Sequence, residues 1–379
     1  MRFAGQDIPN DARHVQTFSA DVSDLSPLAA LPNLTKLEMA GCNVTDLSPL
    51  AGMSQLSELR IENYKLDPDL PAVDDLRPLR SLHNLTHLDL TGSHVRDLTP
   101  LAGLKRLLTL KLSRAPLTDL APVAALPLKT LFLNGTSVAA LHPLRAIHSI
   151  ERLNLMSTRV SGIAPLAALT RLRDLVLSGT AVSDLSPLKG LTSLHALTLS
   201  GGQITDLSPL RGLTGLEQLR LYNMGGDLVD VAALSKLLCL RTLTLHDWAS
   251  PDIRWVASLR RLENLDLRNS SIRDLGPLQW LSRLVYLNLN GCEVSDLEPL
   301  QRCQTLEELF LKETRVSDLT PLRGLTALRI LDIRWTEVSD LTPLVGLGSL
   351  EDLLLAMEID IAQVDALTKS IPGLDVNRQ

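Results

Sequence analysis

Residues 175–194 read LVLSGTAVSDLSPLKGLTSL, and this stretch holds the pattern that decides the fold. Leu175 and Leu177 alternate with a valine, which is the two-residue period of a β-strand whose leucines point to one side. Ser186 and Pro187 fit the start of a tight helical turn, with serine as its cap and proline at the first helical position. The leucine spacing that follows suits a 3₁₀-like return segment with one face inward. The stretch therefore predicts a short strand, a turn and a tight return.

The Asp-Leu-x-Pro-Leu segment of this stretch recurs along the chain in strict and looser copies. There are 16 copies, and 11 of the 15 intervals between them are 22 residues long. Leucine accordingly supplies 87 of the 379 residues, whereas aromatic residues supply only 3%. A fixed period of this length is the sequence signature of a repeat architecture. Because one such unit cannot bury its apolar face alone, we predict that the units stack into a solenoid.

The repeat resembles the leucine-rich repeat superfamily, and its 22-residue unit is most similar to the internalin-type class of bacterial proteins. The resemblance covers about residues 14–376. It implies an α/β solenoid, a curved array with one parallel β-strand per repeat on the concave face and short 3₁₀ or irregular return segments on the convex face. It also implies a protein that binds other proteins, usually on the concave sheet.

The chain departs from this family at the position that follows the strand. The usual asparagine there bonds backbone groups of the turn, and a hydroxyl is expected to make a weaker version of that bond. The residues found instead are mostly threonine, serine, cysteine or glycine, as at Thr136, Thr158, Thr180, Cys42, Cys292 and Gly202.

The ends of a solenoid expose its core and need caps. We expect Phe3 and Ile8 to cover the first repeat, and Ile361–Ile371 to form a short amphipathic helix at the other end. No change of composition marks a linker, so we predict one solenoid domain over 1–379. Its parts are a short N-terminal cap over 1–13, about 16 repeats within 14–364, and a C-terminal cap over 365–379.

Composition and motifs argue against catalysis and against bound metals or cofactors. The net charge of −6 disfavours a general nucleic-acid binder, and no run of 18 apolar residues could span a membrane. The chain has no G-x-S-x-G, P-loop or H-E-x-x-H motif, and its four cysteines form no C-x-x-C pair. The acidic segment between Tyr64 and Asp75 lacks the ligand spacing of a calcium loop. We therefore predict a non-enzymatic protein with no catalytic residue, metal or cofactor.

Function must then lie on the exposed positions of the repeat, which are the residue between the two strand leucines and the next outward-facing residue. In the C-terminal half these positions gather aromatic and basic side chains, and seven of the 11 aromatic residues lie after residue 220. Tyrosine, tryptophan and arginine are enriched at binding hot spots. The predicted partner-binding residues are Arg220, Tyr222, His246, Arg268, Tyr286, Asn288, Phe310, Lys312, Arg334 and Trp335.

Four basic side chains of this surface, among them Arg268 and Arg334, share one row across neighbouring strands. Because like charges repel, we expect the row to give the free protein no structural benefit, although Asp266 and Asp332 offset part of the repulsion. The remaining positive charge would complement an acidic patch on a protein partner. We expect no nucleic-acid partner and no membrane span, and we expect the protein to be a monomer.

Three of the four tryptophans are expected to pack within the fold, and the fourth is interpreted as functional. Trp255 and Trp280 fall on return segments, so we expect them to pack on the convex side, and Trp248 follows a strand, where it would wedge between repeats. Trp335 stands at the sheet edge, where a large ring is hard to bury, and we interpret it as functional.

The location of the protein and its biological role are less constrained. The N-terminus has no apolar segment typical of a secretory signal, so we expect a cytoplasmic protein. One alternative is a bacterial effector that is exported without a cleavable signal and acts in a host cell. A further alternative, suggested by family analogy alone, is a regulatory subunit or inhibitor of an enzyme.

Overall fold

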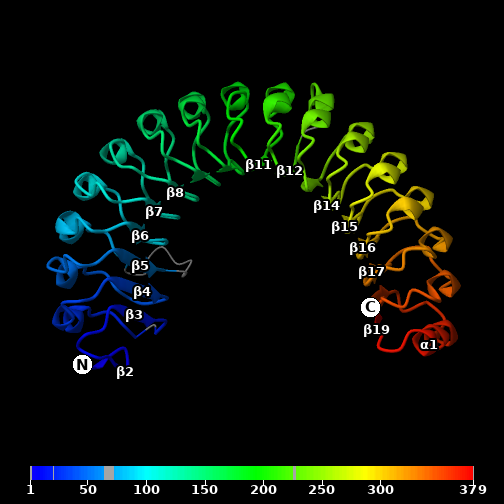
Figure 1. Ribbon diagram of the computed structural model, residues 1–379, viewed down its shortest axis with the longest axis horizontal. Coiled ribbons are helices and arrows are strands. Elements are labelled where there is room, and N and C mark those ends of the chain that lie inside the picture. The colour runs from blue at the N-terminus through cyan, green and yellow to red at the C-terminus, as the bar shows by residue number, and fades with distance from the viewer. Residues whose placement is uncertain (1, 20, 64–71, 225–227, 379) are drawn as a thin grey trace. The chain divides into compact units, whose positions relative to one another are not determined.

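The computed structural model describes residues 2–19, 21–63, 72–224 and 228–378, and the acidic segment predicted around Asp67 and Asp69 lies outside them. The chain divides into two compact units, Met1–Leu194 and His195–Gln379. In each unit the strands lie side by side on the inner side of a bend and the 3₁₀ turns lie on its outer side (Figure 1). The predicted α/β solenoid with one parallel strand and one tight return per repeat is confirmed. A single domain over 1–379 stays a prediction.

The first unit opens with a small antiparallel pair, β1 (Arg2–Phe3) and β2 (Gln6–Asp7). Phe3 and Ile8 are buried there, as expected of a cap. The parallel strands of this unit are β3 (His14–Thr17), β4 (Lys36–Ala40), β5 (Glu58–Glu62), β6 (His87–Asp89), β7 (Thr109–Lys111), β8 (Thr130–Phe132), β9 (Arg152–Asn154) and β10 (Asp174–Val176). The 3₁₀ turns are η1 (Ser26–Ala30), η2 (Ser48–Leu50), η3 (Arg77–Ser81), η4 (Thr99–Leu101), η5 (Ala121–Val123), η6 (His142–Ala146), η7 (Ala164–Ala168) and η8 (Ser186–Leu188).

The second unit repeats this plan and ends in the predicted helix, α1 (Ile361–Ser370), followed by a last strand. Its parallel strands are β11 (Ala196–Ser200), β12 (Gln218–Tyr222), β13 (Thr242–His246), β14 (Asn264–Asp266), β15 (Tyr286–Asn288), β16 (Glu308–Phe310), β17 (Ile330–Asp332), β18 (Asp352–Leu355) and β19 (Asp375–Arg378). The 3₁₀ turns are η9 (Ser208–Gly212), η10 (Val231–Lys236), η11 (Arg254–Ser258), η12 (Gly276–Trp280), η13 (Glu298–Arg302), η14 (Thr320–Leu322) and η15 (Thr342–Leu344).

The core is a set of leucine rows that run from repeat to repeat. Leu265, Leu287 and Leu309 pair in register on β14, β15 and β16, and each has a relative exposure of 0%. In a strand the side chains alternate, so these leucines point into the stack while their neighbours point to the other side of the sheet. The same register therefore lines up the outward-facing residues in straight rows across each unit.

The repeated aspartate, rather than the serine, orders the start of most of the 3₁₀ turns. The prediction that Ser186 caps its turn is wrong, because the cap residue is Leu185, which makes no side-chain bond there. Instead Asp184 accepts a hydrogen bond of 2.8 Å from the backbone N–H of Ser186 through Oδ1. This bond satisfies a backbone donor that the turn itself leaves unpaired. Equivalent bonds are made by Asp24, Asp46, Asp75, Asp97, Asp119, Asp206, Asp252, Asp274, Asp296, Asp318 and Asp340.

This aspartate row predicts an acid-sensitive protein. Hydrogen bonds hold the pKa of several of these carboxyls below the ordinary value, and the side-chain bond from Arg254 is the main reason why the pKa of Asp252 falls from 3.8 to about 2. A depressed pKa in the folded state stabilises the protein above the unfolded pKa, and this contribution is lost as pH falls through the folded value. We expect urea midpoints to be flat near neutral pH and to drop between about pH 4 and pH 2. Because each of these carboxyls is largely exposed, replacing several together, as in Asp24→Asn combined with Asp46→Asn and Asp252→Asn, should make this drop shallower, and an unchanged drop would contradict the assignment.

At the position after the strand, where the chain departs from the family, threonine hydroxyls make the backbone bond that was expected of them. The hydroxyls of Thr136, Thr158 and Thr180 donate to backbone carbonyls three residues earlier, over 2.6–2.8 Å. Cys42 and Cys292 are buried at the same position, so they fill the interior as predicted. Threonine hydroxyls thus bond the backbone of the turn, whereas the two cysteines fill the interior.

Candidate partner-binding face

The first half of the predicted surface is organised around Asp266 on β14. Arg268 donates from Nε to both carboxylate oxygens, at 3.0 and 3.1 Å, and its Nη2 also bonds Oδ2. On the adjacent strand, Nε2 of His246 lies 3.0 Å from Oδ2 of the same carboxylate. Burial acts to raise the pKa of Asp266, but the bonds from Arg268 and the contact with His246 outweigh it and hold the pKa below its ordinary value. One buried carboxylate therefore engages two of the predicted site residues.

The second half has the same arrangement around Asp332 on β17, whose relative exposure is 1%. Arg334 binds this carboxylate with two arms, Nε to Oδ1 at 2.9 Å and Nη2 to Oδ2 at 2.7 Å. The hydrogen bond to Asp332 is the main reason why the pKa of the Arg334 guanidinium is raised. Such two-armed pairs are among the strongest polar contacts in proteins.

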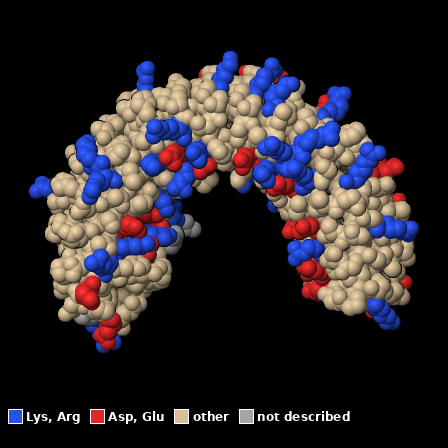
Figure 2. Space-filling view, viewed as in Figure 1, with Lys and Arg blue, Asp and Glu red and all other residues tan. Residues whose placement is uncertain are grey.

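The predicted lack of structural benefit from the basic row is therefore wrong. Arg268 and Arg334, which follow β14 and β17, neutralise the carboxylates at the ends of these strands, so their charges are compensated in the free protein rather than left to repel one another. The two residues of each pair are two positions apart, which places both side chains on one side of the strand. This Asp-x-Arg spacing was readable in the sequence. Figure 2 shows acidic and basic side chains next to one another along the strand side.

Asn288 was predicted to be exposed, and this is also wrong, because its relative exposure is 4%. Its Nδ2 donates to the hydroxyl of Tyr286 at 3.1 Å, and its Oδ1 accepts from the backbone N–H of Asn290 at 3.0 Å. The side chain bends back over its own strand to satisfy these groups. Asn288 thus holds Tyr286 in place instead of offering its own amide to a partner.

Aromatic side chains contact one another between neighbouring strands of the face. Tyr222 and His246 meet edge to face with ring centroids 4.9 Å apart, and Tyr286 and Phe310 are tilted with centroids 5.5 Å apart. Both distances lie in the range that favours aromatic pairs. All four rings remain partly exposed. The register of β12 to β16 thus joins aromatic residues that are far apart in the sequence.

Trp335 is the most exposed predicted residue, with a relative exposure of 53%. Its backbone has a φ of 54°, a left-handed conformation that other repeats give to Gly135, Gly179 and Gly291. A bulky residue is unfavourable in this conformation. The Nζ of Lys312 lies 4.2 Å from the centre of the indole ring, within cation–π range. Trp335 therefore presents an exposed ring just after β17, in contact with Lys312.

The other tryptophans have different positions from one another. Trp248 is buried, with a relative exposure of 1%, and its ring lies next to that of Trp255 with centroids 6.4 Å apart, whereas its place between repeats stays a prediction. Trp280 was expected to pack, yet 43% of it is exposed on the turn side. Two arginines from neighbouring repeats lie over its ring. The sequence signal for this cluster is that most other repeats have glycine, alanine or serine at the position of Trp280.

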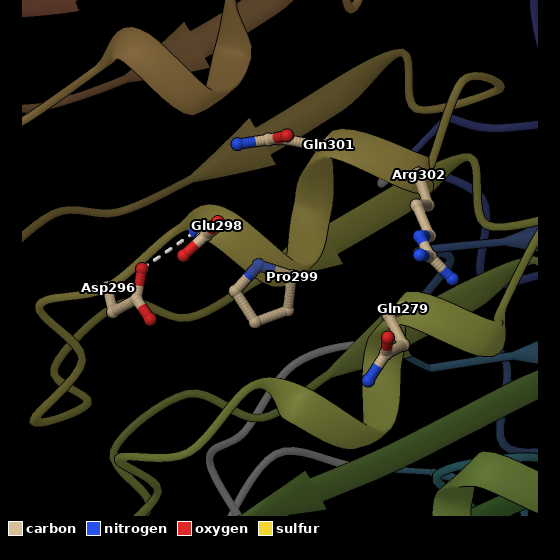
Figure 3. Close-up of a pocket in the computed structure, with 6 residues that line it drawn as sticks. All are labelled: Gln279, Asp296, Glu298, Pro299, Gln301 and Arg302. Atoms are coloured by element: carbon tan, nitrogen blue, oxygen red, sulfur yellow. Dashed lines mark hydrogen bonds between the residues drawn. The ribbon is translucent and has the colours of Figure 1, made fainter.

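The described residues show no constellation that fits catalysis. No group of three or more metal-ligating side chains occurs among them. Burial raises the pKa of the Cys292 and Cys303 thiols to about 11, so neither is a nucleophile near neutral pH. One small pocket of ≈ 280 Å³ lies on the turn side, where Arg302 stands apart from Asp296 and Glu298 (Figure 3). It lacks a nucleophile and base in contact.

The comparisons with known proteins agree with this geometry. A family model described as leucine-rich repeats in two copies matches residues 170–212. The solved structure of an internalin, inlF from Listeria monocytogenes, is 27% identical over 86% of this chain and 87% of that chain, with a TM-score of 0.65. The protein has a leucine-rich-repeat fold of the internalin type.

Two further structures share this leucine-rich-repeat fold. The functional domain of InlJ from Listeria monocytogenes is 19% identical, with 92% of this chain and 73% of that chain covered and a TM-score of 0.70. A leucine-rich-repeat protein from Leptospira interrogans is 19% identical, with 97% and 96% covered and a TM-score of 0.69. No curated protein sequence matches the chain. Leucine-rich-repeat folds are typical of protein–protein interaction modules.

In the described part of the chain, α1 is the one α-helix, and the other helical segments are short 3₁₀ turns. Within the part of the chain that the structure describes, no helix has both the length and the apolar character needed to cross a membrane.

Proposed function

We propose that this leucine-rich-repeat protein is a non-enzymatic interaction module that binds a protein partner on the strand side of its second unit. The observation that carries the proposal is Trp335, a large ring that is half exposed on a left-handed backbone position. The equivalent position is glycine in some repeats, as at Gly179 and Gly291, and a polar residue in others, as at Ser157 and Glu313, whereas Trp335 places a large aromatic ring there. A bulky side chain kept in an unfavourable backbone conformation is a reason to infer function. Exposed tryptophan is also typical of binding hot spots.

The chemistry of the face suggests how a partner is recognised. Trp335, Phe310, Tyr286 and Tyr222 supply rigid aromatic surface, and Asn288 acts through its bond to Tyr286. The positive charges of Arg268 and Arg334 are largely neutralised by their aspartates, and His246 contacts one of the same carboxylates.

Arg220 and Lys312 are then the cations most available to an acidic patch on the partner. Arg220 donates to the neutral Gln218 at 3.2 Å, and it has no acidic partner among the described residues. Lys312 is 3.7 Å from Glu313, a long contact between partly exposed groups. Contacts of this kind are weak, so a carboxylate of the partner can compete for both cations.

The test uses a variant that changes the face without breaking a buried ion pair. Lys312→Glu combined with Trp335→Gly removes the available lysine and the exposed ring together. We expect the partner retained by immobilised wild-type protein, identified by mass spectrometry, to bind this variant more than tenfold more weakly in calorimetry. The melting temperature should change little, because glycine suits the left-handed position.

The matched control introduces glutamate and glycine at the corresponding two frame positions in the first unit. Met156→Glu combined with Ser157→Gly alters a half-exposed side chain and another left-handed residue, whose φ is 55°. This control should bind the partner like the wild type. Equal loss in both variants, or loss in the control alone, would move the binding site away from the second unit.

The proposal also includes the cellular location of the protein and its oligomeric state. We propose a cytoplasmic, monomeric protein, and cell fractionation together with light scattering tests both points. Recovery from the medium or from host cells would favour the exported effector. A change in the rate of a captured enzyme would favour the regulatory subunit or inhibitor.

A further inference from the structure

The turn side of the second unit carries a second surface, which begins with a row of small residues. Each 3₁₀ turn is followed by an apolar residue, and the residue just before it is glycine, alanine or serine in 12 of 15 repeats. The three exceptions are Lys236, Trp280 and Arg302, all in the second unit. The small residues are Ala30, Gly52, Ser81, Gly103, Ala125, Ala146, Ala168, Gly190, Gly212, Ser258, Gly324 and Gly346.

The fold does not require a large side chain in this row. A Cβ atom added to Gly52, Gly103 or Gly190 would meet no other heavy atom within 4 Å, so the position opens to solvent. Trp280 at the same position is accordingly 43% exposed. Its ring contributes little to the leucine core, which is complete in the repeats that carry glycine.

Two arginines lie over the Trp280 ring, one from the repeat before it and one from the repeat after it. The guanidinium carbon of Arg260, which follows η11, is 5.1 Å from the ring centre, and that of Arg302, at the end of η13, is 5.9 Å away. Over the described stretches of the chain, neither guanidinium has an ion pair or a side-chain hydrogen bond. Some other exposed arginines of this unit do have acidic partners, such as Arg241 with Glu263.

A guanidinium that lies over an aromatic ring still has N–H groups to offer. These donors form a planar fork that matches a carboxylate with two bonds. The ring also keeps the flexible arginine side chains near one place, so less conformational freedom is lost when a carboxylate binds. The cluster of Arg260, Trp280 and Arg302, here called the Trp280 clamp, is therefore prepared for an acidic group beside an apolar one.

The surroundings of the clamp favour a peptide over a dense polyanion. The pocket beside it is lined by Gln279, Asp296 and Glu298 as well as Arg302, and Figure 3 shows the two carboxylates at the end away from the guanidinium. These carboxylates would repel a nucleic-acid strand or an anionic membrane, whereas backbone N–H groups of a peptide could donate to them. Leu238, with a relative exposure of 55%, adds apolar surface on the turn side.

We infer that the Trp280 clamp is a second binding surface, which takes an acidic, extended peptide segment of a partner protein. Carboxylates of the segment pair with Arg260 and Arg302, and an apolar side chain between them packs on the exposed part of Trp280. The surface lies on the turn side of the second unit, whereas the proposed partner-binding face lies on its strand side. The two proposals therefore stand on different residues and can fail separately.

The test measures the binding of a short, fluorescein-labelled peptide of alternating glutamate and leucine by fluorescence anisotropy. We expect the wild-type protein to bind it and the affinity to fall steeply with added salt. Trp280→Gly should weaken binding at least tenfold, and so should Arg260→Ser combined with Arg302→Gly. Glycine and serine occur at these positions in other repeats, so the variants should fold, as equal far-UV circular dichroism would show.

Two controls and two competitors decide the outcome. Arg145→Ala combined with Arg171→Ser removes two exposed arginines from the first unit and should bind the peptide like the wild type. The Lys312→Glu, Trp335→Gly variant should also bind it fully, which separates the clamp from the strand-side face. Absence of wild-type binding, or wild-type affinity in Trp280→Gly, would overturn the inference. Tighter binding of a single-stranded oligonucleotide or of phosphatidylserine vesicles would overturn it as well.

Discussion

Leu287→Ala is expected to lower the free energy of unfolding by about 2–5 kcal/mol, which is the range for a large-to-small change in a packed core. Leu287 has a relative exposure of 0% and lies between Leu265 and Leu309 in the same row. Because neighbours on both sides are fixed in register, the stack cannot easily collapse into the cavity. Urea unfolding followed by circular dichroism measures this loss.

The control for this prediction is an outward-facing residue in the same unit. Thr198→Val on β11 keeps the branched shape of the side chain, and Thr198 points away from the leucine core. We expect a change within about 0.5 kcal/mol. Similar losses for both substitutions would show that the inward and outward positions of the repeat are wrongly assigned. A change in the slope of the urea curve would instead indicate that the array no longer unfolds cooperatively.

Arg334→Ala is expected to have an effect of the same size, about 3–5 kcal/mol, although arginine is a polar residue on the strand face. The substitution leaves the carboxylate of Asp332 buried without its two-armed partner. An uncompensated charge in such a place is costly because water cannot replace the lost bonds. Adding Asp332→Asn to Arg334→Ala should restore part of the loss, since it removes the buried charge. The measurement is again urea unfolding, at neutral pH.

An exposed pair with the same spacing is the matched control. Arg254 and Asp252 are also two residues apart and bonded, yet their side chains have relative exposures of 84% and 47%. Arg254→Ala should therefore cost less than about 1 kcal/mol, as is usual for exposed ion pairs. If Arg334→Ala cost no more than Arg254→Ala, burial would not be what makes the Asp332 pair important.

The stability role of Arg334 also determines how binding should be studied. A charge reversal at Arg268 or Arg334 would disturb a buried carboxylate and the partner face together, so a loss of binding could not be assigned. Lys312 and Trp335 are better positions, because they contact each other, the ion pair of Lys312 with Glu313 is long, and Trp335 is half exposed. Arg268 and Arg334 are thus engaged by buried aspartates of the face, whereas Lys312 and Trp335 are available to a partner.

The amino-acid sequence by itself determined the frame of the solenoid. Its 22-residue period placed the strands, the inward leucines and the buried cysteines correctly. Each of these features is a local property of one repeat, and stacking copies it from repeat to repeat. The start of the 3₁₀ turn was the exception, because serine and aspartate are both common capping residues and only the backbone geometry shows that Asp184 makes the bond.

Only the tertiary structure decided what the outward-facing side chains do. The sequence placed Arg268, Arg334 and Asn288 in the correct rows, but it did not show that the two arginines fold onto buried aspartates or that the asparagine is covered. It likewise placed Trp280 on a return segment without revealing Arg260 and Arg302 above its ring. Backbone alternation fixes the direction in which a Cβ points. The partner of a long side chain depends instead on which groups of the neighbouring strands and turns lie within its reach, and that is set by stacking in three dimensions.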